Sequence, residues 1–349
     1  MQIGLGIPTC REGLAYPSGF ADLPATARLA QRAARLGFDS LWANDHLATQ
    51  RVVMDSLPTP PNFYEPIVTF AFLAPQVPRL RFVLATIVAP LREPVLLAKQ
   101  VATLDQATGG RVTLGLGIGA YREEFEAINR AAGTINRGAM LDETVAALRL
   151  LFGRRRAAYA GKYVGFAEIE VFPKPAQNPL PIFLSGNSPD AIRRAAVLAD
   201  GWILAGASPE QARSSIASLR QSAEAAGRAP DAIQACVQAW VSGGETEREA
   251  TRRLVESQHF RRLRALKPDE AEETAIRSFA AQNLFGSPEQ MLRRIDEYGR
   301  AGVDHLGLVF LADRIDQLAA GVELFGERVL PNVRDRRGSV AMASERPGA

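Results

Sequence analysis

The sequence predicts an α/β protein built as a (β/α)8 barrel, or TIM barrel, with insertions. Eight short, β-rich apolar runs alternate with amphipathic helices, and this alternation indicates parallel strands joined by helical crossovers. The runs at 82–88 and 112–116 are apolar almost throughout, as expected of strands buried on both faces, whereas 2–7 alternates loosely. A doubly wound open sheet would produce a similar pattern and remains the alternative.

Each predicted element is bounded by residues that start or stop helices. Proline stands in the first turn of five predicted helices, where its missing N–H group has no partner to lose. These helices begin near Pro66, Pro94, Pro189, Pro209 and Pro288. Glycine closes the helices at 23–36 and 94–108. Further helices are predicted at 123–130, 138–152 and after the last strand. The predicted strands are 2–7, 38–42, 82–88, 112–116, 180–184, 201–204, 233–241 and 304–310.

Three segments interrupt the alternation and are predicted to be insertions, at about 47–65, 153–179 and 245–285. The first has no apolar period and contains several prolines, so we expect a long loop, which in a compact domain is typically a lid or disordered. The second carries short β runs, and the third is charged and helical. We expect residues 1–334 to form a single domain and the polar tail at 335–349 to be disordered.

Composition disfavours several classes of function. The net charge is 41 − 38 = +3, too small to indicate a nucleic-acid partner. Two cysteines, Cys10 and Cys236, and three scattered histidines form neither a disulfide framework nor a metal site. The sequence shows no signal peptide and no run of eighteen apolar residues, so we expect a soluble cytoplasmic protein without a membrane partner.

Functional residues of such barrels lie after the carboxyl ends of the strands. The polar and glycine residues there are Asp45, His46, Thr86, Gly117, Gly119, Ser185, Gly186, Asn187 and Ser188. His46 is the only histidine at such a position with a carboxylate beside it, so it is a candidate for proton transfer; capping the next segment is its alternative role. The turn at 185–188 precedes a helix and suits a phosphate, although Ser188 would also serve as an ordinary N-cap.

Gly115 to Ala120 fits the pattern G-x-G-x-x-A of a dinucleotide-binding turn. We disfavour that interpretation because the run follows the fourth predicted strand instead of the first. The residue at the spacing expected for a ribose-binding acid, Asp142, also lies inside a predicted helix. The run is better interpreted as a crowded strand end where the backbone passes close to a flat ligand.

These features resemble the bacterial luciferase-like monooxygenases and their deazaflavin-dependent relatives. The matching stretches lie in the family's order between residues 1 and 330. They include Gly37–Trp42 with Asp45 and His46, Gly109–Arg111 with Leu114–Gly117, Glu123–Phe125, Ser185–Ser188 with Ala199–Trp202, and Gly302–His305. Each piece is short, and the ordered set carries the resemblance.

The resemblance implies a barrel that holds FMN or the deazaflavin coenzyme F-420 at the carboxyl ends of its strands. His46 aligns with the family's active-site histidine, and Asp45 is expected to orient it. The phosphate loop aligns with Gly186, Asn187 and Ser188. In such proteins the segment matching Ala85 to Val88 often carries a non-prolyl cis peptide against the flavin. The expected cofactor-binding residues are Ala85, Thr86, Gly117, Gly119, Ser185, Gly186, Asn187 and Ser188.

The function favoured by the resemblance is a reduced-FMN-dependent monooxygenase of a small organic substrate. A separate NAD(P)H:flavin reductase would supply the flavin, since the chain shows no nicotinamide-binding pattern. The alternative is a deazaflavin-dependent oxidoreductase that transfers hydride without oxygen, because an Asp-His pair is common in that group. A non-catalytic flavin-binding protein is a third hypothesis. The luciferases' paired histidines are missing, which argues against light emission, and a homo-oligomer, either a dimer or a tetramer, is expected.

Overall fold

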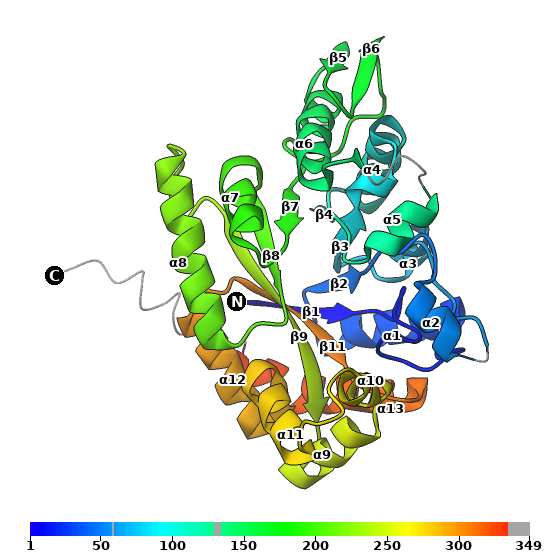
Figure 1. Ribbon diagram of the computed structural model, residues 1–349, viewed down its shortest axis with the longest axis vertical. Coiled ribbons are helices and arrows are strands. Elements are labelled where there is room, and N and C mark those ends of the chain that lie inside the picture. The colour runs from blue at the N-terminus through cyan, green and yellow to red at the C-terminus, as the bar shows by residue number, and fades with distance from the viewer. Residues whose placement is uncertain (58, 129–133, 334–349) are drawn as a thin grey trace, which may run out of the picture.

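The computed structural model describes residues 1–57, 59–128 and 134–333, and its centre is a closed barrel of parallel strands (Figure 1). The barrel strands are β1 Gln2–Gly6, β2 Ser40–Ala43, β3 Arg81–Val88, β4 Val112–Gly117, β7 Ile182–Ser185, β8 Gly201–Ala205, β9 Gln234–Gly243 and β11 His305–Phe310. They are neighbours in this order, and β11 pairs with β1 to close the ring. The predicted barrel is therefore confirmed, and the open-sheet alternative is wrong.

Helices α1 Leu23–Leu36, α3 Pro66–Leu73, α4 Pro94–Thr108, α6 Arg137–Gly153, α7 Pro189–Leu198, α8 Pro209–Ala225, α12 Pro288–Arg300 and α13 Ile315–Arg328 connect or follow the strands. All five predicted proline starts are confirmed, and each follows a side-chain N-cap. Gly37 and Gly109 end their helices in the left-handed conformation, with φ of 86° and 64°. Short 3-10 turns, η1 Ala74–Gln76 and η2 Ala89–Leu91, extend α3 and β3.

The three insertions contain secondary structure of their own. The first, predicted as a loop, includes the short helix α2 Arg51–Ser56. The second forms a hairpin of β5 Ala157–Ala160 and β6 Gly165–Ile169. The third holds α9 Glu247–Glu256, α10 Gln258–Leu266, α11 Glu272–Gln282 and the strand β10 Leu284–Gly286. We did not predict β10, because three residues between a helix and the Ser287 cap are too few to show a period. Among the described strands it pairs with the carboxyl end of β9 alone.

Two expectations fall partly or wholly on residues outside the described ranges. The helix expected at 123–130 is α5 Arg122–Ile128, and residues 129 and 130 are not among those described. The tail expected at 335–349 also lies outside them. No helix within the described ranges is long and apolar enough to cross a membrane.

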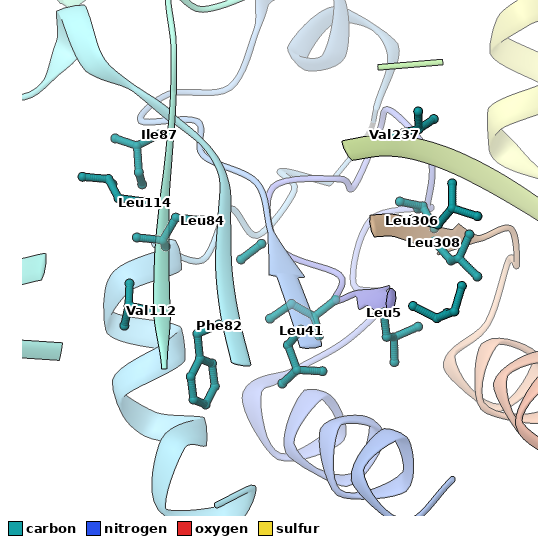
Figure 2. Close-up of a cluster of buried hydrophobic side chains, with 14 of the residues drawn as sticks. Leu5, Leu41, Phe82, Leu84, Ile87, Val112, Leu114, Val237, Leu306 and Leu308 are labelled. Atoms are coloured by element: carbon teal, nitrogen blue, oxygen red, sulfur yellow. The ribbon is translucent and has the colours of Figure 1, made fainter. Parts of the chain in front are cut away.

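The main core lies between the barrel and its helices. Side chains such as Leu5, Leu41 and Phe82 point outward from their strands into this layer (Figure 2). Neighbouring residues on the same strands face inward, and Trp42 fills the amino-terminal part of the barrel interior. A Cβ atom on Gly4 or Gly307 would lie 2.3 or 2.4 Å from the Trp42 ring, so this filling depends on glycine. The carboxyl end of the barrel is left for polar residues.

Candidate active site

The carboxyl ends of β3, β4 and β7 bring several predicted site residues together. The β3–β4 register shifts between Leu84 and Ile87, so Ala85 and Thr86 leave the regular ladder. The peptide between them is cis, as in the family pattern. Ser185 Oγ donates a hydrogen bond to Thr86 Oγ1 at 3.3 Å. A Cβ atom on Gly117 would lie 2.7 Å from Ser185 Oγ, so these residues form one continuous surface of small groups.

The glycine run at the carboxyl end of β4 is crowded, as interpreted from the sequence. A Cβ atom on Gly115 would lie 2.2 Å from the backbone oxygen of Leu84, so the irregular part of β3 requires glycine opposite it. Gly119 accepts a hydrogen bond from Arg137 Nη1 at 3.0 Å through its carbonyl oxygen. The close approach of this run to a ligand stays a prediction.

His46 lies after β2 and is held by a carboxylate from another part of the chain. Its Nδ1 atom lies 2.9 Å from Glu124 Oε2 and 2.9 Å from Gln50 Nε2. The rings of Phe63 and Tyr121 lie 5.7 and 5.6 Å from its own ring. An ionised Glu124 only accepts hydrogen bonds and therefore places the proton of neutral His46 on Nδ1; the Gln50 amide, whose Oε1 atom has no other partner, then turns its oxygen and not its NH2 group toward this N–H. No contact within the described residues uses Nε2, which is left free to exchange a proton.

Glu124 is buried, being 4% exposed. Its hydrogen-bond partners favour the ionised carboxylate. Its Oε1 atom accepts hydrogen bonds from the backbone N–H groups of Leu47 and Ala48 at 2.7 and 3.3 Å. Burial raises the pKa of the carboxyl, but the hydrogen bond and charge of His46 and these two N–H groups outweigh it, so the pKa lies below its ordinary value. Glu124 therefore orients His46 and fixes the start of the first insertion.

Asp45 does not contact His46, contrary to the role expected of it. Its carboxylate accepts hydrogen bonds from the Val88 N–H group at 3.0 Å and from Arg92 Nη2 at 2.5 Å. The half-buried Arg92 also pairs with Glu65 at 3.0 Å. Side chains of adjacent residues in extended backbone point to opposite sides, which explains why Asp45 turns away. Asp45 thus anchors the end of β3, and the carboxylate at His46 comes from α5.

The turn at residues 185–188 uses its side chains to hold its own shape. The Asn187 amide donates to the carbonyl of Ala205 at 2.7 Å and accepts from the N–H group of Ala205 at 3.1 Å. Ser188 Oγ accepts from Ala191 N at 3.2 Å as the N-cap of α7. The Gly186 carbonyl accepts from Trp202 Nε1 at 2.9 Å. Backbone N–H groups are therefore what this helix start offers to an anion.

Comparison with known proteins agrees with this geometry. The family described as luciferase-like monooxygenase matches residues 1–305. The FMNH(2)-dependent dimethylsulfone monooxygenase of Pseudomonas putida is 28% identical over 350 residues, covering 92% of each chain. The F420-dependent glucose-6-phosphate dehydrogenase of Nakamurella multipartita is 28% identical over 335 residues, covering 91% of this chain and 93% of its own. The chain belongs to the luciferase-like monooxygenase family.

Solved structures of this fold agree with the barrel. The oxygenating constituent of 3,6-diketocamphane monooxygenase from Pseudomonas putida, in complex with FMN, superposes with a TM-score of 0.73 at 21% identity. The match covers 95% of this chain and 98% of that one. This superposition confirms the barrel, and the family match with the curated relatives confirms the family and the assignment as a flavin-dependent oxidoreductase.

The other two histidines of this luciferase-like protein are held within the fold by hydrogen bonding or ring stacking. His305, at the start of β11, bonds to Ser40 Oγ at 2.8 Å. His259 is 9% exposed and stacks on Trp240 with 4.1 Å between ring centroids. Helix α10 is amphipathic and turns this residue toward the barrel. The buried Cys10 thiol donates to the carbonyl of Tyr64 at 3.4 Å.

Proposed function

We propose that the protein is a flavin-dependent monooxygenase that uses reduced FMN and oxygen to oxidise a small organic substrate. The observation that carries this proposal is His46, whose Nε2 atom is free while Glu124 holds Nδ1. A histidine so oriented can exchange one proton with a bound molecule through Nε2. The dimethylsulfone monooxygenase relative, whose name specifies FMNH(2), supports the choice of cofactor.

The residues at the barrel's carboxyl end fit a flat tricyclic ring with a phosphorylated tail. Thr86 and Ser185 are partly exposed beside Gly117, and the ring would pack against these small groups, with Ala85 buried beneath them in the barrel interior. The free backbone N–H groups at the start of α7 would bind the phosphate, with Asn187 and Ser188 holding the turn in shape. When bound, reduced flavin supplies the electrons that activate oxygen.

The chain's own residues then manage water and one proton. The first insertion is fixed over this end of the barrel by two neighbouring carboxylates of α5. Glu124 binds its start, and Glu123 accepts from Arg51 N at 3.0 Å. Phe63 and Tyr121 flank His46, so water has limited access to the imidazole, which is 12% exposed as a side chain. His46 would exchange a proton with substrate or cofactor through Nε2, and Glu124 stabilises the imidazolium that forms.

A deazaflavin-dependent oxidoreductase remains the second candidate function. The specific observation in its favour is the glucose-6-phosphate dehydrogenase relative that names F420, which is as similar to this chain as the sulfone monooxygenase is. In this reaction His46 would again handle the proton, and oxygen would not be consumed.

We also propose that a separate reductase supplies the reduced flavin and that the chain forms a homo-oligomer. The G-x-G-x-x-A run packs against β3 and does not open a helix directly, which supports an external source of reducing equivalents. Exposed Val68 and Phe72 on α3 and Leu96 on the adjacent α4 fit a subunit contact.

The test is a titration of the purified protein with FMN, anaerobically reduced FMN and reduced F420, followed by oxygen uptake with NADH and a flavin reductase. Dimethyl sulfone and related small sulfur compounds and ketones form the first substrate panel. We expect reduced FMN to bind and substrate-dependent product to appear, and His46→Gln to bind FMN but lose turnover. Tight binding of F420 with substrate oxidation and no oxygen uptake would replace the first function by the second.

A further inference from the structure

The barrel's carboxyl end contains a buried arginine for which the described residues supply no counter-ion. Arg11 follows β1 and is 5% exposed. Its Nη2 atom donates to the Asn44 side-chain oxygen, and its guanidinium lies over the Trp240 ring at 5.3 Å from the centroid. Its Nε atom is buried without a hydrogen-bond partner, and no ion pair among the described residues includes Arg11. Such a buried, uncompensated charge is unfavourable unless a ligand completes it.

Nearby carboxylates are already engaged elsewhere. Glu12, the next residue, accepts from the backbone N–H groups of Gly19, Phe20 and Asn62. The carboxylate of Asp45 pairs with Arg92, and that of Glu124 contacts His46. The acceptor that Arg11 lacks is therefore not available from these carboxylates.

A second unpartnered donor lies on the inner face of β9. Cys236 belongs to the cluster inside the barrel, so Gln238 and Trp240, two and four residues further on, also face inward. Gln238 Nε2 is buried and has no hydrogen-bond partner. Strand β11 lies between β9 and β1, and the contact of Arg11 with Trp240 shows that the guanidinium reaches over it. The guanidinium of Arg11 can only donate, which indicates a ligand that accepts hydrogen bonds, and the Gln238 amide can add a second donor.

The third insertion adds a positive charge, that of Arg262, near Arg11 and Trp240. Arg262 of α10 donates to the Tyr121 hydroxyl at 3.2 Å, a neutral partner, and Tyr121 contacts His46. Burial, with the charges of Arg262 and Arg11, lowers the pKa of His259 to about 4. His259 is therefore neutral at physiological pH, and the potential around Trp240 is positive.

We propose that Arg11, with Gln238 and Arg262, binds the oxyanion head group of the substrate, a sulfonate or a carboxylate. The inference rests on the proposed function, because it takes the bound anion to be the molecule that is oxidised. The head group would lie between β1, β9 and α10, and the rest of the substrate would extend toward His46 and the small-residue surface of β3 and β4. The substrate class is then an organic acid anion, in contrast to the neutral sulfone named for the relative.

Equilibrium binding without flavin tests the site independently of turnover. Methanesulfonate and dimethyl sulfone have nearly the same shape, with a charged oxygen in one where the other has a methyl group. We would titrate straight-chain alkanesulfonates, alkanecarboxylates and methyl sulfones of matched length by calorimetry at constant ionic strength. We expect one oxyanion series to bind at least about tenfold more tightly than the sulfones. Equal affinities, or no binding of any oxyanion, would overturn the proposal.

Arg11→Met removes the charge and the Nε donor while keeping a long side chain. We expect the affinity for the anion to fall about 10- to 150-fold, the loss of one charge-assisted hydrogen bond. Arg122→Met is the matched control: Arg122 lies at the start of α5, is exposed and pairs with Glu126, and its removal should change affinity less than twofold. Unchanged anion affinity in Arg11→Met would overturn the proposal.

Thermal unfolding separates binding from a structural role. Removing an uncompensated buried charge should leave the melting temperature of Arg11→Met unchanged or higher. A lower melting temperature with anion affinity intact would mean that Arg11 only supports Asn44 and Trp240, and the proposal fails. Arg11-dependent anion binding in a protein that shows no turnover with either reduced cofactor would leave this site standing and overturn the proposed function instead.

Discussion

Replacing Glu124 by glutamine should impair the reaction because it changes the protonation of one atom, Nε2 of His46. In the wild type, Oε1 of Glu124 accepts from the N–H groups of Leu47 and Ala48, and Oε2 faces His46 Nδ1. A glutamine oxygen must stay on the two N–H groups, which would otherwise lose their acceptor, so the glutamine NH2 group faces Nδ1. Nδ1 then has to accept, and the ring proton moves to Nε2. The free nitrogen changes from an acceptor to a donor.

The size of the effect follows from the role that is lost. General acid–base catalysis contributes about 10²- to 10⁴-fold, which corresponds to roughly 2.7–5.5 kcal/mol of barrier. We therefore expect kcat/KM of Glu124→Gln to fall by about this factor, with the dissociation constant for FMN nearly unchanged. Flavin binding by fluorescence and product formation with a supplied flavin reductase measure the two quantities separately.

A neighbouring residue provides the control. Glu123 also lies in α5 and also binds the first insertion, but its carboxylate contacts Arg51 N and not His46. Glu123→Gln makes the same chemical change one position away and should alter kcat/KM less than threefold. If Glu124→Gln retained kcat/KM within threefold of the wild type, the assignment of His46 Nε2 as the proton-transfer atom would be wrong.

Three further predictions follow from buried groups. Asp45→Asn weakens the pair with Arg92 and should lower stability by about 3 kcal/mol, or roughly 4 °C in melting temperature for a chain of this size; an unchanged value in calorimetry would contradict the pairing. Because the folded pKa of Glu124 is lowered, its ionisation stabilises the fold above the ordinary value of 4.5, and this contribution is lost as pH falls through the folded pKa. The stability difference between wild type and Glu124→Gln, measured by urea unfolding, should therefore shrink on acidification below about pH 4.5, and a difference that grows there would refute the sign. Burial raises the pKa of the Cys10 thiol to about 12 and also raises that of Cys236, so neither should react with a thiol reagent at pH 8 until the protein is denatured.

The sequence alone determined the elements and their order. Hydrophobic period, N-caps, first-turn prolines and terminal glycines act within a few residues, so helices such as 23–36 could be predicted to the residue. The alternation of strands and helices then left few topologies, of which the barrel is one. Strand β10 could not be predicted in this way, because it is three residues long and is formed by its pairing with β9.

The site depended on contacts that no local pattern records. The sequence placed His46 at a strand end and offered Asp45 as its partner, but the partner is Glu124, 78 positions along the chain. A signal was present, since Glu124 follows β4 and so belongs to the same end of the barrel, but nothing local set it apart from Glu123. The same holds for Arg11, an ordinary loop residue in the sequence and a buried charge in the structure.

The physical reason is the range of the interactions. Helix and strand formation is decided by neighbours in the chain, whereas the partner of a side chain depends on strand register, on the direction of each Cα–Cβ bond and on which loops fold over the barrel. Adjacent residues such as Asp45 and His46 are thereby sent to opposite sides, and distant residues such as His46 and Glu124 meet. The sequence thus determined the barrel and the end of it that holds the site, and the tertiary structure decided which groups are paired there and which are left free for a ligand.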